Sequence, residues 1–117
     1  MGASTDFKVK NFTKLANRNL MGKLIINDNL FLRQFEVEIE DDLAIIEYAL
    51  QDRKIFLTKL IIPSSNKDEN FEDIFIREVF EIIKEKNIRI MPTAPQVRKF
   101  IKKNKEFKEL LPIGVRL

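Results

Sequence analysis

The stretch PTAPQVRKFIKKNKEFKEL, residues 92–110, decides the fold of this chain. Thr93 and Gln96 have the spacing of a capping box, and Pro95 is tolerated in a first helical turn, so a helix is predicted over about residues 94–104. Its apolar stripe recurs at helical spacing and consists of Val97, Phe100 and Ile101. A short helical turn and then an edge strand or tail are expected to follow.

A second helical pattern precedes this one. Its apolar residues are Phe71, Ile74, Phe75, Val79, Phe80, Ile82 and Ile83. Asn70 is a good N-cap, and Asp73 stands where the acid of a capping box would lie. Asn87 suits the left-handed position that closes a helix. A helix is therefore predicted over residues 71–86.

Strand patterns fill the chain before residue 64. Between residues 35 and 40, apolar Phe35, Val37 and Ile39 alternate with Glu36, Glu38 and Glu40, which predicts a half-exposed strand with one acidic face. Residues 22–28 are predicted to form a short strand that ends in a turn at Asn27, Asp28 and Asn29.

Residues 43–50 form the next predicted strand. Residues 54–63 are almost continuously apolar, which predicts a central strand that is covered on both faces. Residues 88–91 complete the set as a short buried strand. The short turns indicate an antiparallel meander. The predicted class is therefore α+β, with a mixed, mostly antiparallel sheet and two helices packed on it.

Composition excludes several classes of site. The 117 residues include no Cys and no His, which excludes disulfides, Cys/His zinc sites and a histidine general base, and we expect no metal. Residues 1–20 are predicted to be an N-terminal extension in which Phe7, Val9 and Phe12 are candidates to dock on the domain, and residues 21–117 to be a single domain. No apolar run approaches the roughly 20 residues of a membrane span. We expect a cytoplasmic protein without membrane contact.

Beyond these patterns, residues 24–111 resemble the small single-domain acetyltransferase-like proteins of the GNAT superfamily. The matching stretches are QFEVEIEDDLAIIEY (34–48), IFLTKLIIP (55–63) and, most specifically, residues 92–110. In the last stretch the family spacing is kept by Pro92, Pro95, Val97, Phe100, Ile101, Glu106, Phe107 and Leu110. The resemblance implies a GNAT-like fold and an acetyl-CoA-dependent N-acetyltransferase.

This resemblance also implies a place for each part of the cofactor. The pantetheine arm would bind the backbone of residues 59–62 where that strand splays from residues 88–91, and the pyrophosphate would lie on N–H groups around residues 67–72. The implied cofactor-binding residues are Leu60, Ile61, Ile62, Lys67, Asn70, Phe71, Ala94 and Arg98. An acceptor amine would approach near Glu36, Glu38 or Tyr48, and the candidate catalytic residues are Glu36, Tyr48 and Lys59.

The sequence departs from the family pattern at the positions that carry catalysis and cofactor binding. Ala94 replaces a cysteine, Lys59 replaces a histidine, and the glycine-rich loop corresponds to KDENFE, residues 67–72. Side chains obstruct close approach of a phosphate to the backbone, and Asp68 and Glu69 repel it, so weak or absent acetyl-CoA binding is predicted. The alternative function of these acids is to cap the helix that follows. The alternative to a catalytic role for Lys59 and the acidic strand face is that both are ordinary solvent-exposed surface.

A basic run follows on the last helix. It consists of Arg98, Lys99, Lys102, Lys103, Lys105 and Lys108. The run is a candidate contact for nucleic acid, an acidic partner or the 3′-phosphate of CoA, but it lacks interleaved aromatics and the net charge is only +3. We expect a solvated face and no nucleic-acid partner. Two alternatives to an acetyltransferase-like protein remain: a non-catalytic GNAT-fold protein that binds a protein partner or another acyl ligand, and a small nucleic-acid accessory protein.

Overall fold

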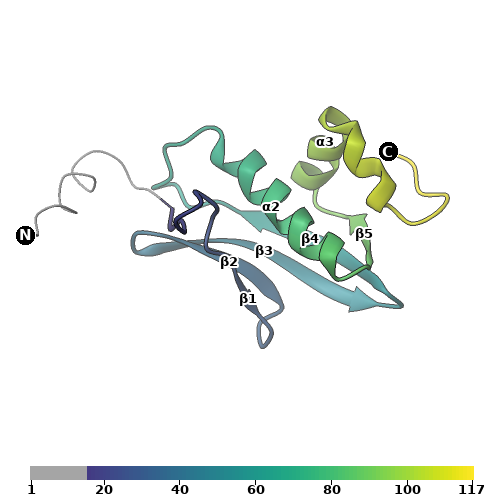
Figure 1. Ribbon diagram of the computed structural model, residues 1–117, viewed down its shortest axis with the longest axis horizontal. Helices are drawn as coiled ribbons and strands as arrows, with labels where there is room; N and C mark the ends of the chain where they lie inside the picture. Colours follow the sequence, from purple (N-terminus) through teal and green to yellow (C-terminus); the bar gives the residue numbers. More distant parts are fainter. Residues whose placement is uncertain (1–15) are drawn as a thin grey trace, which may run out of the picture.

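The structure is a computed structural model that describes residues 16–117. Its elements, in chain order, are β1 (Asn27–Asn29), β2 (Gln34–Ile39), β3 (Asp42–Gln51), β4 (Lys54–Ile61), α2 (Phe71–Glu85), β5 (Arg89–Pro92), α3 (Pro95–Lys103) and the 3₁₀ helix η1 (Lys105–Leu110). The strands form one sheet in the order β1-β2-β3-β4-β5 (Figure 1). All neighbours are antiparallel except β4 and β5, which are parallel. The predicted α+β class and mixed, mostly antiparallel sheet are confirmed.

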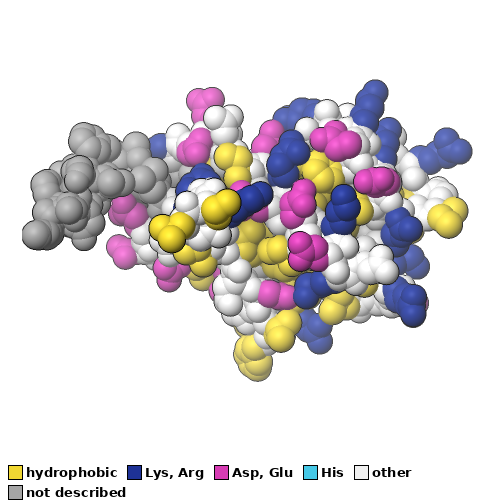
Figure 2. Space-filling view, in the orientation of Figure 1, with side chains coloured by type: hydrophobic (Ala, Val, Ile, Leu, Met, Phe, Trp, Pro, Cys, Tyr) yellow, Lys and Arg dark blue, Asp and Glu magenta, His cyan; other side chains and the backbone are white. Residues whose placement is uncertain are grey.

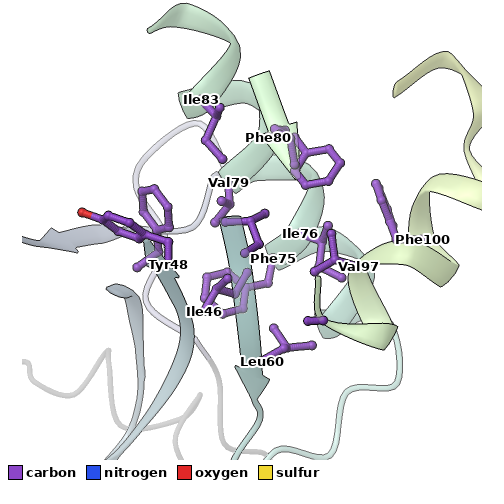
Figure 3. Close-up of a cluster of buried hydrophobic side chains, with 14 of the residues drawn as sticks. Ile46, Tyr48, Leu60, Phe75, Ile76, Val79, Phe80, Ile83, Val97 and Phe100 are labelled. Atoms are coloured by element: carbon purple, nitrogen blue, oxygen red, sulfur yellow. The ribbon is translucent and has the colours of Figure 1, made fainter. Parts of the chain in front are cut away.

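One face of the sheet builds the core. Ile46, Tyr48 and Leu60 lie on this face, and α2 contributes Phe75 and Val79 to the same core (Figure 3). All five side chains are at most 6% exposed. The strand residues share this face because alternate residues of a strand point to the same face of a sheet.

The opposite face is open. Leu43 and Ile61 lie on it and are 44% and 39% exposed. The prediction that residues 54–63 form a central strand covered on both faces is therefore wrong: β4 is fourth in the sheet, β3 is central, and only one face of β4 is buried.

The two predicted helices are confirmed to within one residue at each end, but the predicted capping boxes are wrong. The N-cap of α3 is Ala94, and no side chain caps it. Gln96 points instead toward β4, where its Nε2 lies 3.5 Å from the Leu60 carbonyl. At α2, Asn70 is the N-cap without a side-chain hydrogen bond, and the Asp73 carboxylate lies 3.3 Å from the Lys103 ammonium. Tertiary partners of these side chains replace the local caps.

Asn87 closes α2 as predicted. Its backbone has a φ of 61°, in the left-handed region that asparagine adopts more readily than most residues. The chain turns there into β5, which pairs with the first half of β4.

The first hairpin differs from its prediction. Asn27, Asp28 and Asn29 form β1 rather than a turn, and the turn follows at residues 30–33. Long-range partners stabilise this arrangement, because β1 pairs with β2 and its side chains reach Glu36 and Tyr48. Before β1, isolated bridges join Ala16 to Ile39 and Arg18 to Leu24. The docking predicted for Phe7, Val9 and Phe12 lies outside the described residues.

An aromatic cluster joins α2, α3 and η1. The ring of Phe80 meets Phe100 edge-on at 5.5 Å and Phe107 at 5.3 Å. The guanidinium of Arg77 lies over the rings of Phe100 and Phe107 at 5.4 and 5.3 Å. Such contacts add to the burial of the rings, so they fix α3 and η1 against α2. Among the described residues, no helix is both long and apolar enough to cross a membrane.

Candidate functional site

The candidate site begins where β4 and β5 separate. The two strands pair only from Lys54 with Arg89 to Leu57 with Pro92. The backbone N–H groups of Thr93 and Ala94 then both donate to the Leu57 carbonyl, at 3.1 and 2.8 Å, and the chain turns away into α3. Within the described chain, residues 59–61 of β4 pair with β3 and have no strand on their other side.

A β-bulge marks the same point on β4. Tyr48 pairs with Leu57 and Glu47 pairs with Lys59, which leaves Thr58 as the extra residue between them. The Thr58 hydroxyl donates to the Glu47 carbonyl at 3.2 Å. A bulge bends its strand and shifts the alternation of side chains, which explains why Thr58 and Lys59 are both exposed while Leu60 is buried. The free edge of β4 is thus a built feature of the sheet.

The small residue Ala94 forms the end of this opening. Its side chain is 1% exposed, and its N–H is one of the two that close on the Leu57 carbonyl. Gln96 lies two residues further and faces the Leu60 carbonyl, at the edge of hydrogen-bonding distance. An extended ligand with amide groups has the chemistry to pair with this free edge, since a sheet edge offers a row of N–H and C=O groups.

The loop before α2 has the opposite character. The Asp68 carboxylate accepts a hydrogen bond from the Asn70 N–H at 2.9 Å, and the Asp68 carbonyl accepts from the Phe71 N–H at 3.2 Å. Asn66 completes the loop by donating its amide to the Asp68 carbonyl at 3.1 Å. An anion at the helix start would bind backbone N–H groups such as those of Asn70 and Phe71. In this protein, oxygens of Asp68 already accept both.

Glu36 lies on the open face of the sheet, on β2. Its carboxylate accepts hydrogen bonds from the side-chain amides of Gln34 at 2.6 Å, Asn29 at 2.8 Å and Asn27 at 3.1 Å. Partial burial acts to raise the pKa of Glu36, but these three donors together outweigh it and lower the pKa below its ordinary value. A carboxylate held in this way is a weak base.

Tyr48 lies on the buried face, next to the bulge. Its hydroxyl donates to Asp28 Oδ1 at 2.6 Å, and its ring lies 5.0 Å from that of Phe35. Burial, reinforced by the hydrogen bond and by the negative charge of Asp28, raises the pKa of Tyr48 to about 12. The phenol therefore keeps its proton over the physiological range and is engaged by Asp28.

The other predicted site residues differ in exposure. Ile61, Lys67 and Lys59 are exposed, and Ile62 is partly buried. Phe71 is a core side chain that is 1% exposed. The structure thus brings Leu60 and Ala94 to one opening, with the loop of Lys67, Asn70 and Phe71 at the start of α2. It places Glu36 and Tyr48 on opposite faces of the sheet. Among residues 16–117, no cluster of three or more acidic side chains has the geometry to hold a metal ion.

Positive charge gathers on α3 and the C-terminal segment. Residues 84–117 contain ten basic and three acidic residues, whereas residues 34–83 contain five basic and thirteen acidic ones. Figure 2 shows Lys and Arg side chains over the region of α3 and the C-terminus. Arg98 belongs to this basic surface, where it lines a shallow pocket with Lys99, Lys102 and Arg116.

Three structural features of the candidate site do not follow from the sequence. The bulge at Thr58 leaves no local signal, because its cause is the register against β3. The local pattern predicts a cap for Gln96 and a turn for Asp28, the partner of Tyr48. The sequence shows Asp68 as an obstacle to phosphate, but its hydrogen bonds to the helix start follow only from the loop geometry.

The comparison with protein families agrees with this geometry. Residues 34–110, about two thirds of the chain, match the family model described as GCN5-related N-acetyl-transferase. The matched span runs from the start of β2 to the end of η1 and so contains the bulge, the opening between β4 and β5, and both helices. No curated protein matches the sequence closely enough to serve as a relative. The chain belongs to the GCN5-related N-acetyltransferase family.

Proposed function

We propose that this protein binds the acyl-pantetheine arm of acetyl-CoA along the free edge of β4 and presents the acyl group to an amine. The observation that carries the proposal is the stretch of β4 beyond the bulge at Thr58, which pairs with β3 on one edge only. Its other edge lies next to the turn at Ala94. The amide groups of pantetheine match the spacing of a strand, so they supply the hydrogen bonds that a neighbouring strand would supply.

Only this half of the cofactor fits the residues present. At the start of α2, the Asp68 carboxylate already accepts the Asn70 N–H, and a pyrophosphate there would meet that negative charge. Like charges a few ångströms apart in a partly desolvated site repel by about 1 kcal/mol or more. We therefore propose that the pantetheine arm provides most of the affinity and that acetyl-CoA binds weakly.

Acyl transfer from such a complex would depend on positioning. The thioester supplies an activated acyl group; a neutral amine attacks its carbonyl carbon, the C–N bond forms, the C–S bond breaks, the amine proton passes to solvent, and the departing thiolate takes up a proton from solvent. Neither Glu36, with its lowered pKa, nor Tyr48, with its raised pKa, is poised to exchange a proton near neutral pH. The contribution of the protein is the alignment of the two reactants.

A second candidate function is ligand binding without transfer. The same two residues favour it, since both are held in hydrogen bonds that serve the β1–β2–β3 end of the sheet. Transfer and binding alone are distinguished by whether labelled acetyl groups from acetyl-CoA appear on added amines in the presence of the protein.

Calorimetric titration with acetyl-pantetheine and with acetyl-CoA tests the binding proposal. Because the phosphate end contributes little, the two dissociation constants are expected to agree within about threefold, a difference below 1 kcal/mol. A preference for acetyl-CoA of about thirtyfold or more would contradict this account, and so would the absence of binding by both ligands.

A further inference from the structure

Three consecutive large apolar residues are exposed at the tip of the β1–β2 hairpin. Leu30, Phe31 and Leu32 are 69%, 92% and 56% exposed. The tip projects from the body of the molecule in Figure 1, and yellow side chains gather there in Figure 2. We call these three residues the knob. Because they bury little in the folded chain, the fold does not require them, and such a run signals an interaction surface.

Polar side chains hold the knob in place. Asn29 Oδ1 accepts the Leu32 N–H at 2.9 Å, and the Asn29 amide donates to Glu36 at 2.8 Å. Gln34, the first residue after the turn, donates to the same Glu36 oxygen at 2.6 Å. The turn is therefore preorganised, which lowers the entropy lost when its apolar residues dock.

A pocket lined by apolar and charged side chains lies at the other end of β1. It has a volume of about 260 Å³ and lies between the segment before β1 and α2. Its lining residues are Leu24, Ile26 and Ile82, with Lys23, Glu78, Glu81 and Glu85 around them. A cavity of about 150 Å³ accepts benzene, so this pocket has room for one phenyl ring.

We propose that the knob of one copy of this chain docks into this pocket of a second copy. The knob follows β1 and the pocket precedes it, so a two-fold axis across β1 brings each knob to the pocket of the other copy. This is a closed, isologous contact, which gives a dimer and no filament. Arg33 follows the knob directly, and three glutamates and one lysine line the pocket, which leaves it with a net negative charge, so the charges of the two surfaces are complementary.

This dimer does not depend on the proposed function, and the edge position of β1 makes the two compatible. β1 is at one edge of the sheet, and β4 and β5 separate near the other. A dimer through β1 therefore leaves both free β4 edges open to ligand.

Sedimentation velocity of the full chain over a range of concentrations up to about 500 μM tests the proposal. A concentration-dependent dimer is expected, and Phe31→Ser should raise its dissociation constant at least about tenfold. Ile113→Ser is the matched control, because Ile113 is 100% exposed but lies in the C-terminal tail, and it should leave the dimer unchanged. Thermal melting of both variants checks that they fold.

Charge exchange provides the second test. Arg33→Glu and Glu81→Lys should each weaken the dimer, and the double variant should recover at least part of the loss, because the two charges then attract again. A monomer at every concentration overturns the proposal, as does a dimer that Phe31→Ser leaves intact. A monomer that sediments with phosphatidylcholine vesicles through Phe31 would also overturn it, since the knob would then belong to a lipid surface.

Discussion

The Asp68 carboxylate and the Asn70 backbone N–H form a 2.9 Å hydrogen bond at the start of α2. An N–H group at a helix start is a natural partner for a phosphate oxygen, and here a side chain of the same loop has taken it. In this acidic loop without glycine, Asp68 thus holds two backbone N–H groups at the start of α2. Asp68 oxygens hold the Asn70 and Phe71 N–H groups, and the Asp68 carboxylate would repel a pyrophosphate.

Asp68→Gly should therefore improve acetyl-CoA binding. The change removes the competing carboxylate and frees the Asn70 N–H, so we expect the dissociation constant for acetyl-CoA to fall about tenfold, or 1.4 kcal/mol. Acetyl-pantetheine, which lacks the pyrophosphate, should bind as before. Calorimetry with both ligands measures the difference.

Glu69→Gly is the control for this change, since it also removes one acid and adds one glycine in the same loop. It should improve acetyl-CoA binding less than Asp68→Gly does. Equal gains would assign the effect to net charge or loop flexibility and would contradict the specific function of Asp68. Loss of the carboxylate's hydrogen bond to the Asn70 N–H should cost Asp68→Gly about 1 kcal/mol of unfolding free energy.

Tyr48 allows a direct pKa measurement, because it is the sole tyrosine of the chain. Burial and the contact with Asp28 raise its pKa to about 12, so its absorbance near 295 nm should titrate well above pH 10 in the folded protein. A raised pKa means that the folded state favours the neutral phenol. The resulting stability is complete below pH 10 and is lost as the pH rises toward 12.

Asp28→Asn separates the causes of this shift. It removes the negative charge while burial stays, so the pKa of Tyr48 should fall part of the way toward 10. A tyrosine that titrates near pH 10 in the folded wild-type protein would show that the contact between Tyr48 and Asp28 does not form in solution.

Two phenylalanines test the division between core and surface. Phe80 is fully buried among Phe100 and Phe107, and Phe80→Ala should lower the unfolding free energy by about 3–5 kcal/mol. Phe31 is 92% exposed, and Phe31→Ala should change the stability of the monomer by no more than about 0.5 kcal/mol. Urea unfolding at low protein concentration measures both. A similar loss in the two variants would mean that the knob packs against the domain.

How much the sequence predicts depends on the range of the interactions. Both helices follow from apolar spacing, and the structure agrees at their ends to within one residue. The acidic face of β2 also follows from alternation, as does the α+β class. In each case the decisive residues are neighbours in the chain.

Features that depend on partners distant in the chain could not be predicted from the local sequence. Asn27 to Asn29 look like a turn locally, but Glu36 and Tyr48 hold them in a strand. Gln96 looks like a capping residue, but the Leu60 carbonyl lies in its reach. The bulge at Thr58 arises only when β4 meets β3, so the sequence resemblance placed the splayed strands while the local pattern did not.

Deleting Thr58 tests the function of the bulge. Removal of the extra residue restores regular pairing with β3 and keeps Ile55, Leu57 and Leu60 on the buried face, so the chain should still fold. The bend of β4 should be lost, and acetyl-pantetheine binding with it. A thermal melt checks folding and calorimetry checks binding. Unchanged binding by the deletion variant would show that the bulge does not create the site.

The most direct test of the central claim is an NMR titration of the labelled protein with acetyl-CoA, followed at each backbone amide. The account predicts shift changes for residues 58–62 and 93–96, little change for residues 68–71, and a dissociation constant above about 10 μM. A constant below about 10 μM with large changes at residues 68–71 would show that the start of α2 holds the pyrophosphate after all. Changes confined to residues outside the β4–β5 opening would show that the free edge of β4 is not the binding site.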